Sequence, residues 1–263
     1  IVPSFNPPHK GRSGLSAFSY RYEMTKLAIE NIKSKTKIIL SDIETEEDGF
    51  SYTLNTVRKI NREILKNSNL YLICGSDVLY DVKKWHKPDK LLKEIGLYVF
   101  TRPGFDDENL QIHAKSVIES YNAEIYFSKL KMPDISSNNI RKNLNSDMLS
   151  AKSDLQDNIY DFIISNRIYD DEYSLGNLDD KTIKLLTSYE KILRRQLTPK
   201  RLIHSLNTMR EALKLAKIHS ADPVKSAITG ILHDCAKYNG SGDLYRIMEE
   251  NGKAENISEN ECK

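Results

Sequence analysis

The stretch Leu70-Tyr-Leu-Ile-Cys-Gly-Ser-Asp77 joins an apolar, strand-like run to a glycine and a carboxylate. Similar short runs recur at Lys37 to Ile43, Leu97 to Thr101 and Ala123 to Phe127. Between them lie segments whose apolar residues recur every three or four positions, which is helical spacing. Alternation of strands and helices is typical of parallel βαβ units. We therefore predict an α/β domain built on a parallel sheet, and ligands in such sheets bind beyond the carboxyl ends of the strands.

The composition changes between Asp170 and Asp180, where the chain is acidic and has no sustained period. Beyond this stretch the strand signals stop. Thr198-Pro199 and Asp222-Pro223 each combine a capping side chain with proline at the first helical position, which predicts two helix starts. We predict a first domain at residues 1–172, a linker at 173–183 and an all-α domain at 184–263.

Charge and cysteine content limit the classes of function. The 263 residues include 39 Lys and Arg against 37 Asp and Glu, so no basic field predicts nucleic-acid binding. No apolar run approaches the roughly 18 residues that a membrane span needs. Three cysteines without a C-x-x-C pair argue against a disulfide scaffold and favour a cytoplasmic protein. The chain opens with Ile-Val-Pro, which we interpret as an internal start. A homo-oligomer is compatible with this sequence.

Two motifs in the first domain suit a nucleotide. Gly75 allows close approach of a ligand at a strand end, where the Asp77 carboxylate can accept hydrogen bonds from ribose hydroxyls. Ser136 and Ser137 begin a predicted helix whose free amides suit a phosphate, and Arg141 follows one turn later. A bare Gly-Ser-Asp is a weak signal, and the second motif alone also fits a plain helix cap with a solvated arginine.

Taken together and in this order, these motifs resemble those of the bacterial nicotinate-mononucleotide adenylyltransferases, members of the nucleotidylyltransferase superfamily. The resemblance covers residues 1 to about 170. It also rests on Val2-Pro3, Pro7-Pro8-His9-Lys10, Tyr22-Glu-Met24, Gly49-Phe-Ser-Tyr-Thr53, Trp85 and Thr101-Arg-Pro-Gly104. It implies a Rossmann-like domain that transfers an adenylyl group from ATP to nicotinate mononucleotide with Mg²⁺, a step of NAD biosynthesis.

The resemblance also implies roles for individual residues. Asp77 and the segment from Ile135 to Arg141 would hold ATP, with Ser136 and Arg141 near its phosphates. Thr53 and Trp85 would face the nicotinate ring and its carboxylate, with Arg102 also at the substrate. His9 and Lys10 would lie near phosphate. Asn138 departs from the family, which usually has Thr there.

The stretch from Phe5 to Gly11 also invites comparison with the family's first motif, Gly-x-Phe-x-Pro-x-His-x-Gly-His. Val-Pro-Ser precedes Phe5, and Arg12 stands where the second His would be. The distance to Tyr22 fits the family's later Pro-Pro-His-Lys loop better. We therefore expect the first strand, the catalytic His pair and the first helix to be absent, and no catalytic residue is assigned.

A second cluster of candidate residues lies in the all-α region. His204 lies on a predicted helix, and His233-Asp234 follows 29 residues later at the end of the next helix. Imidazole and carboxylate suit Mn, Fe or Zn. A single His-Asp pair is weak evidence for a metal site. The alternative is a helical domain that serves only as a spacer.

The runs Arg201-Leu-Ile-His204 and Ala227 to Lys237 resemble the HD-domain phosphohydrolases that split diadenosine tetraphosphate symmetrically. This implies a metal-activated water, Fe or Mn held by His204, His233 and Asp234, and Lys237 near substrate phosphate. The family's further metal ligands would follow Lys263, so we expect an incomplete centre.

Three hypotheses follow. The first is a bifunctional enzyme acting on ATP, nicotinate mononucleotide and a dinucleoside polyphosphate. The second is a nucleotide-binding or regulatory protein that lacks turnover. The third is an adenylyltransferase for a related substrate such as pantetheine phosphate or nicotinamide mononucleotide.

Overall fold

The computed structural model describes residues 1–8, 16–46, 49–64, 68–101, 107–130, 132–175 and 178–236. By its internal contacts the chain divides into two compact units. The first comprises Ile1–His9 and Ile39–Asn143, and the second comprises Lys10–Ile38 and Leu144–Lys263. Among the residues described, no helix combines the length and apolar character needed to cross a membrane.

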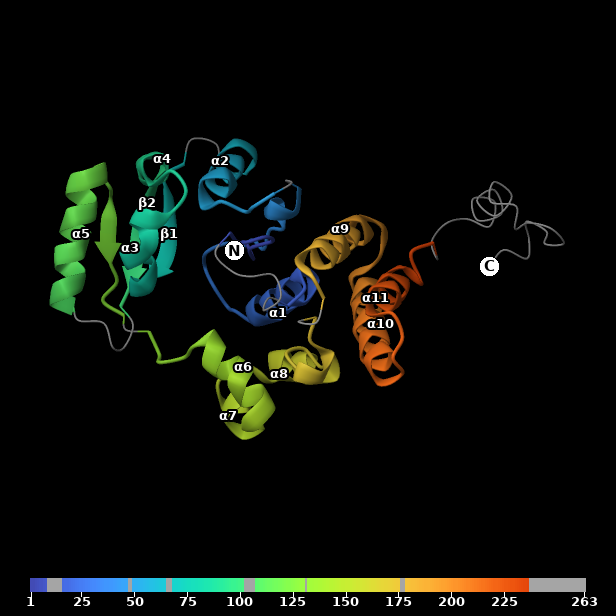
Figure 1. Ribbon diagram of the computed structural model, residues 1–263. Helices are drawn as coiled ribbons and strands as arrows, with labels where there is room; N and C mark the ends of the chain where they lie inside the picture. The colour runs from blue at the N-terminus through green and yellow to red at the C-terminus, as the bar shows by residue number, and fades with distance from the viewer. Residues whose placement is uncertain are drawn as a thin grey trace. The chain divides into compact units, whose positions relative to one another are not determined.

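The first unit is built on a parallel sheet in the order β1-β2-β3 (Figure 1). The strands are β1 (Leu70–Gly75), β2 (Ile95–Phe100) and β3 (Ile125–Phe127). The helices of this unit are η2 (Ile43–Glu46), α2 (Thr53–Glu63), α3 (Ser76–Asp81), η3 (Val82–Lys84), α4 (Pro88–Glu94) and α5 (Asp107–Tyr121). The parallel sheet predicted from strand and helix alternation is confirmed.

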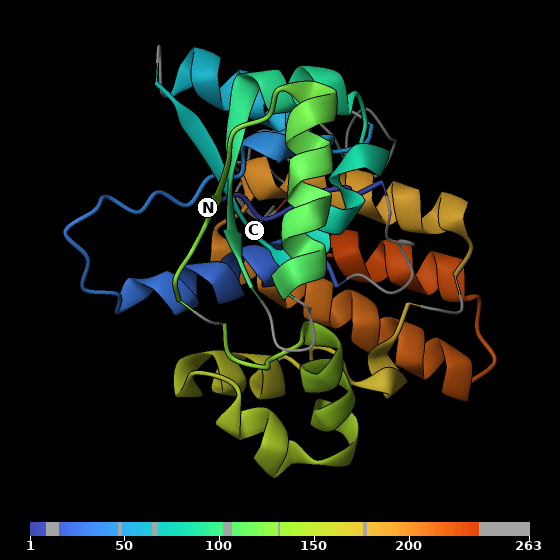
Figure 2. The same ribbon diagram turned by 90° about the vertical axis from the view of Figure 1, so that its left-hand side faces the viewer.

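The core of the first unit lies between one face of this sheet and the helices α3, α4 and α5. Figure 2 shows α5 running alongside the strands. Leu97 and Val99 of β2 are fully buried, as are Leu79 of α3 and Val117 of α5. Alternate residues of the strands point away from this core, and Ile73 of β1 is 72% exposed. The half-buried pattern follows from the two-residue period of a strand.

One predicted strand is wrong. Residues 37–42 have no regular structure, and Ile43 begins the helix η2. Ile38 and Ile39 of this stretch are 38% and 40% exposed. Its backbone pairs with Ile1, whose amino group donates to Ile39 O and whose carbonyl accepts from Ser41 N, while Asp42 O accepts locally from Thr45 N of η2. Two bonds to one residue do not make a ladder, so apolar β-branched residues alone did not suffice here.

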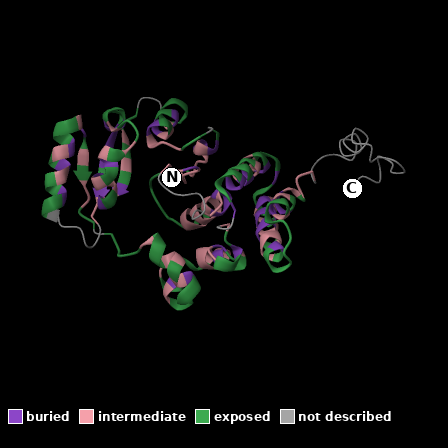
Figure 3. Ribbon diagram, viewed as in Figure 1, coloured by how far each residue is buried: buried purple, intermediate pink, exposed green. Residues whose placement is uncertain are grey.

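The second unit contains only helices among its described residues. They are α1 (Phe18–Glu30), α7 (Met148–Ser153), α8 (Asp157–Ser165), η4 (Asp171–Tyr173), α9 (Asp180–Gln196), α10 (Pro199–Ile218) and α11 (Pro223–Leu232). Helix α6 (Ser137–Ser146) crosses the limit between the units. Both predicted caps are confirmed, since Thr198 Oγ1 accepts from Arg201 N and Asp222 Oδ1 accepts from Val224 N and Lys225 N. Figure 3 shows the buried residues of α10 and α11 in purple.

Helix α1 packs within the second unit. Ser19 N donates to the buried Glu190 carboxylate of α9 at 2.7 Å, and Tyr20 Oη donates to Asn207 Oδ1 of α10 at 2.6 Å. Burial raises the pKa of Tyr20 to about 12. From the sequence, we placed the residues of α1 in a first domain that ends at residue 172. The domain limits 1–172 and 184–263 stay a prediction.

Candidate functional site

A cavity of about 160 Å³ lies in the first unit. Two residues predicted to face the substrate ring line it: Thr53 at the first position of α2, and Trp85 directly after η3. The other lining residues are Ser4, Pro7, Pro8, Ser51, Tyr52, Leu54, His86 and Leu91. Drug-sized ligands occupy pockets of about 300–1,000 Å³. This cavity therefore suits a single ring rather than a whole nucleotide.

Hydrogen bonds hold the proline-rich wall of the cavity in place. Asn6, which is 6% exposed, donates from its backbone to Ser51 Oγ at 3.0 Å and from Nδ2 to Gly49 O at 2.6 Å. Its carbonyl accepts from Ser51 N at 2.9 Å. One residue before it, Phe5 N donates to Glu44 Oε2 at 2.9 Å. Asn6 thus joins the wall formed by Pro7 and Pro8 to the segment that leads into α2.

Three residues of the cavity lining are aromatic: Tyr52, Trp85 and His86. The rings of Tyr52 and His86 stack with centroids 4.1 Å apart and an interplanar angle of 24°. Trp85 is half-buried against the hydrophobic core of the unit, and Leu91, which also lines the cavity, is buried. Aromatic and apolar walls with a few hydroxyls are suited to a flat ring that carries a polar substituent.

The residues predicted to bind ATP lie on two elements. Gly75 ends β1, and Asp77 lies in the first turn of α3 with its side chain exposed. Both therefore lie at the carboxyl end of a strand of the parallel sheet, where ligands of α/β folds bind. Neighbouring Cys74 is buried, and this burial, with a smaller contribution from the Asp77 charge, raises the pKa of its thiol to about 11.

The second predicted ATP motif begins α6. Ser137 is the first residue of this helix, and Ser136 Oγ accepts a hydrogen bond from Asn139 N at 3.1 Å. The serine hydroxyl thus caps one of the amides that could otherwise meet a phosphate. Arg141 Nη2 donates to Asn138 Oδ1 and is half-buried. Four other predicted site residues lie outside the described residues: His9, Lys10, Arg102 and Lys237.

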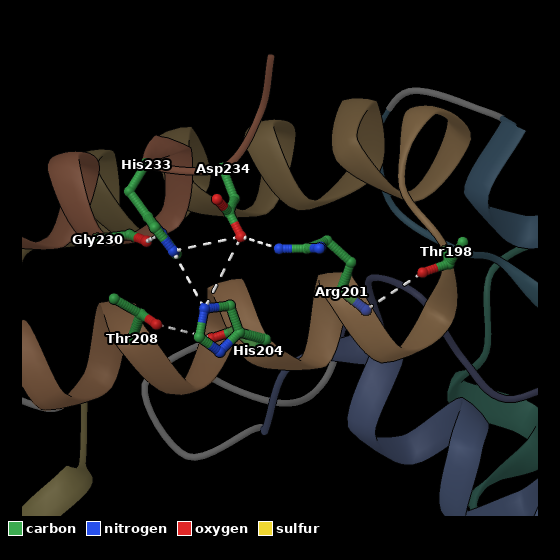
Figure 4. A network of polar contacts seen from close by, with 7 residues as sticks. All are labelled: Thr198, Arg201, His204, Thr208, Gly230, His233 and Asp234. Atoms are coloured by element: carbon green, nitrogen blue, oxygen red, sulfur yellow. Dashed lines mark hydrogen bonds and ion pairs between the residues drawn. The ribbon is translucent and has the colours of Figure 1, made fainter. Parts of the chain in front are cut away.

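A separate cluster in the second unit brings three predicted metal ligands together (Figure 4). His204 lies on α10, and His233 and Asp234 follow α11. His204 Nε2 is 3.2 Å from His233 Nε2, and Asp234 Oδ2 is 3.8 Å and 3.6 Å from these two nitrogens. This is the one group of three or more potential ligand residues found across the described parts of the chain.

The geometry of this cluster fits a transition-metal ion. For these three distances, a point equidistant from the atoms lies about 2.1 Å from each, which matches metal bonds to imidazole and carboxylate of roughly 2.0–2.2 Å. His233 Nδ1 is 2.8 Å from Gly230 O, so a proton on Nδ1 would leave Nε2 free to bind an ion. Asp234 Oδ2 also pairs with Arg201 Nη1 at 2.5 Å.

Gly230 of α11 allows this helix to approach α10 closely. A Cβ atom there would lie 2.6 Å from Met209 Cα and 3.0 Å from both Met209 N and Thr208 O. All three are backbone atoms of α10, so only glycine fits without a shift of a helix. Sequence reasoning missed this role, as it missed Tyr52 and His86, because each depends on contacts between distant segments.

Comparison with known proteins gives relatives for the first part of the chain. The family model described as Cytidylyltransferase-like matches residues 1–143. The probable nicotinate-nucleotide adenylyltransferase of Clostridium tetani (strain Massachusetts / E88) is 36% identical over 144 residues, which are 55% of this chain and 70% of that protein. The protein of the same description from Clostridium botulinum (strain Hall / ATCC 3502 / NCTC 13319 / Type A) is 33% identical over 170 residues, covering 64% and 82% respectively.

A solved structure is also similar. Plasmodium falciparum nicotinic acid mononucleotide adenylyltransferase complexed with NaAD aligns with a TM-score of 0.53 and 23% identity, over 65% of this chain and 81% of that one. At this identity the likeness shows a shared fold.

Proposed function

The chain belongs to the cytidylyltransferase-like family, and on this premise we propose that its first unit joins ATP to nicotinate mononucleotide. The products would be deamido-NAD and pyrophosphate. The observation that carries the proposal is the cavity that Thr53 and Trp85 share, 32 positions apart in the chain. Both were expected at the substrate ring, and the cavity has the size and the aromatic wall that a pyridine ring needs.

In this proposal the residues of the chain bind and orient the two substrates and do not themselves react. Trp85 offers a face on which the pyridine ring stacks, and the Thr53 hydroxyl can hydrogen-bond to its substituent. Asp77 accepts hydrogen bonds from ribose hydroxyls, and Ser136 and Arg141 contact phosphates. Nucleotidyl transfer depends mainly on such positioning and on electrostatic stabilisation.

A divalent ion such as Mg²⁺ would supply positive charge at the transferred phosphate. Mg²⁺ in such sites binds chiefly to substrate phosphates, water and one or two carboxylates. Across the described residues of the first unit, no group of three potential ligand residues converges. This donor set fits an ion that arrives with ATP rather than one held in a protein cage.

The proposal is tested by titrating nicotinate mononucleotide into the protein in a calorimeter and by measuring pyrophosphate release with ATP. Loss of ring stacking costs about 1–3 kcal/mol per base in aromatic binding sites. We therefore expect Trp85→Ala to weaken binding roughly 5-fold to 150-fold, and Trp85→Phe to retain most of it. Equal affinity for the wild type and Trp85→Ala would refute the assignment of the cavity to the substrate.

A second activity is favoured by the cluster of His204, His233 and Asp234. We propose that this cluster binds Fe or Mn and that the second unit hydrolyses dinucleoside polyphosphates. The support is the convergence of two imidazole nitrogens and one carboxylate oxygen within 4.8 Å. The ion would activate water for attack on phosphorus. Incubation of the metal-loaded protein with diadenosine tetraphosphate should yield adenosine diphosphate alone, and an absence of hydrolysis with all three of Fe, Mn and Zn would refute the hydrolase.

The alternative is a protein that binds nucleotides without turnover. The same experiments separate the two: binding of nicotinate mononucleotide and ATP without pyrophosphate release would favour the binding protein. Release that depends on both ligands would favour the enzyme.

A further inference from the structure

We propose that His86 selects a pyridine ring that carries a carboxylate over one that carries a carboxamide. This inference rests on the proposed binding of a pyridine mononucleotide in the cavity of the first unit. It concerns a residue that sequence reasoning left without a role, because His86 has no functional signal of its own beside Trp85.

The position of His86 supports this role. It lines the same cavity as Thr53 and Trp85, and it is the immediate neighbour of Trp85 in the chain. Its imidazole stacks on the ring of Tyr52, the residue directly before Thr53, with centroids 4.1 Å apart. The stack ties one side of the cavity to the start of α2. A ligand ring bound beside Trp85 would therefore have the imidazole next to it.

The chain turns sharply directly after His86. Lys87, directly after His86, has a φ of 52° in the left-handed region, and Pro88 then begins α4. A non-glycine residue in that region is uncommon and marks a sharp turn held by its surroundings. The stack on the Tyr52 ring limits the freedom of the side chain. His86 is exposed, so a ligand can reach its imidazole.

The chemistry of the cavity wall singles out His86. The other lining residues are apolar, aromatic or hydroxyl-bearing, so His86 is the only described lining side chain that can carry a positive charge. A protonated imidazole forms a charge-assisted hydrogen bond with a carboxylate, which is roughly twice as strong as a neutral bond. A carboxamide is neutral and gains no such attraction. The difference between the two ligands is what sets specificity.

The test uses the single tryptophan of the chain, Trp85, as a fluorescent reporter inside the cavity. Three ligands are titrated: nicotinate mononucleotide, nicotinamide mononucleotide and nicotinate riboside, which keeps the carboxylate but has no phosphate. Calorimetry checks each affinity, because a neighbouring histidine can itself change tryptophan emission. His219→Ala, which removes an exposed histidine at the end of α10, is the matched control.

We expect His86→Ala to weaken binding of both carboxylate ligands about tenfold, as for loss of a hydrogen bond to a charged group. Binding of nicotinamide mononucleotide should change less than about twofold. His86→Lys, which restores a cation without the ring, should recover part of the preference for the carboxylate.

Two outcomes would overturn the inference. If His86→Ala weakens both mononucleotides equally and spares nicotinate riboside, His86 binds the phosphate instead. If no ligand is affected, His86 has no part in selection. Failure of the proposed function looks different, since the wild-type protein would then bind none of the three ligands.

Discussion

Replacement of Gly230 by alanine is the sharpest test of how helices α10 and α11 build the cluster of His204, His233 and Asp234. The added Cβ would lie 2.6 Å from Met209 Cα, whereas carbon atoms in contact prefer about 3.5–4.0 Å. The obstructing atoms belong to the backbone of α10, so no side-chain rotation relieves the clash. Helix α11 must therefore move by about 1 Å relative to α10.

Such a shift affects the metal site more than it affects folding. His204 lies on α10 and His233 follows α11, so the 3.2 Å separation of their Nε2 atoms changes with the helices. Metal–ligand distances tolerate only about 0.2 Å. We expect about 10-fold to 100-fold weaker metal binding, as for loss of a supporting contact. Overpacking costs about 1–3 kcal/mol, and the higher helix propensity of alanine offsets about 1 kcal/mol of it.

The assay is competition of Mn²⁺ or Co²⁺ against a chelator of known affinity, with urea unfolding measured on the same preparations. Thr229→Ala, at the exposed position next to Gly230, is the control and should match the wild type in both measurements. Wild-type metal affinity in Gly230→Ala would show that close helix approach does not set the ligand geometry, and it would refute this reasoning.

Four further predictions follow from the two units. The double change His233→Ala and Asp234→Ala should remove bound metal, as measured by elemental analysis, because it deletes two of three ligands. Asn6→Ala should lower the free energy of unfolding by about 0.5–1.5 kcal/mol in urea, since it removes the hydrogen bond from Asn6 Nδ2 to Gly49 O. The Cys74 thiol, with its pKa raised to about 11, should resist iodoacetamide at pH 8 in the folded protein and react once it is unfolded; rapid labelling of the native peptide would contradict this. Asp77→Ala should abolish ATP binding in a titration, and unchanged affinity would refute the nucleotide-site assignment.

Local signals in the sequence predicted much of the fold. The strand that ends at Gly75 and the parallel sheet around it were predicted from alternating apolar runs, and the caps Thr198 and Asp222 from their position before proline. The membership of the first part in a nucleotidyltransferase family is confirmed by its relatives. The strand predicted from Lys37 to Ile43 is wrong because a strand is defined by its partners, and here two hydrogen bonds to Ile1 do not form a ladder.

The sites were predictable only where a motif carried them. His204, His233 and Asp234 were named from residue type and from the resemblance of their flanking runs to HD-domain phosphohydrolases, and the structure brings their ligand atoms together. The stack of Tyr52 on His86 joins residues 34 positions apart, and no local pattern encodes it. Gly230 reads as an ordinary helix glycine in the sequence, because the backbone that it approaches belongs to another helix.

The central claim is that the cavity beside Trp85 binds the pyridine ring of nicotinate mononucleotide. A crystal structure of the protein with this ligand tests it most directly. The account predicts the ring against the face of Trp85, with its carboxylate within hydrogen-bonding distance of Thr53 or His86. A ligand bound elsewhere in the first unit, with only water in the cavity, would contradict it.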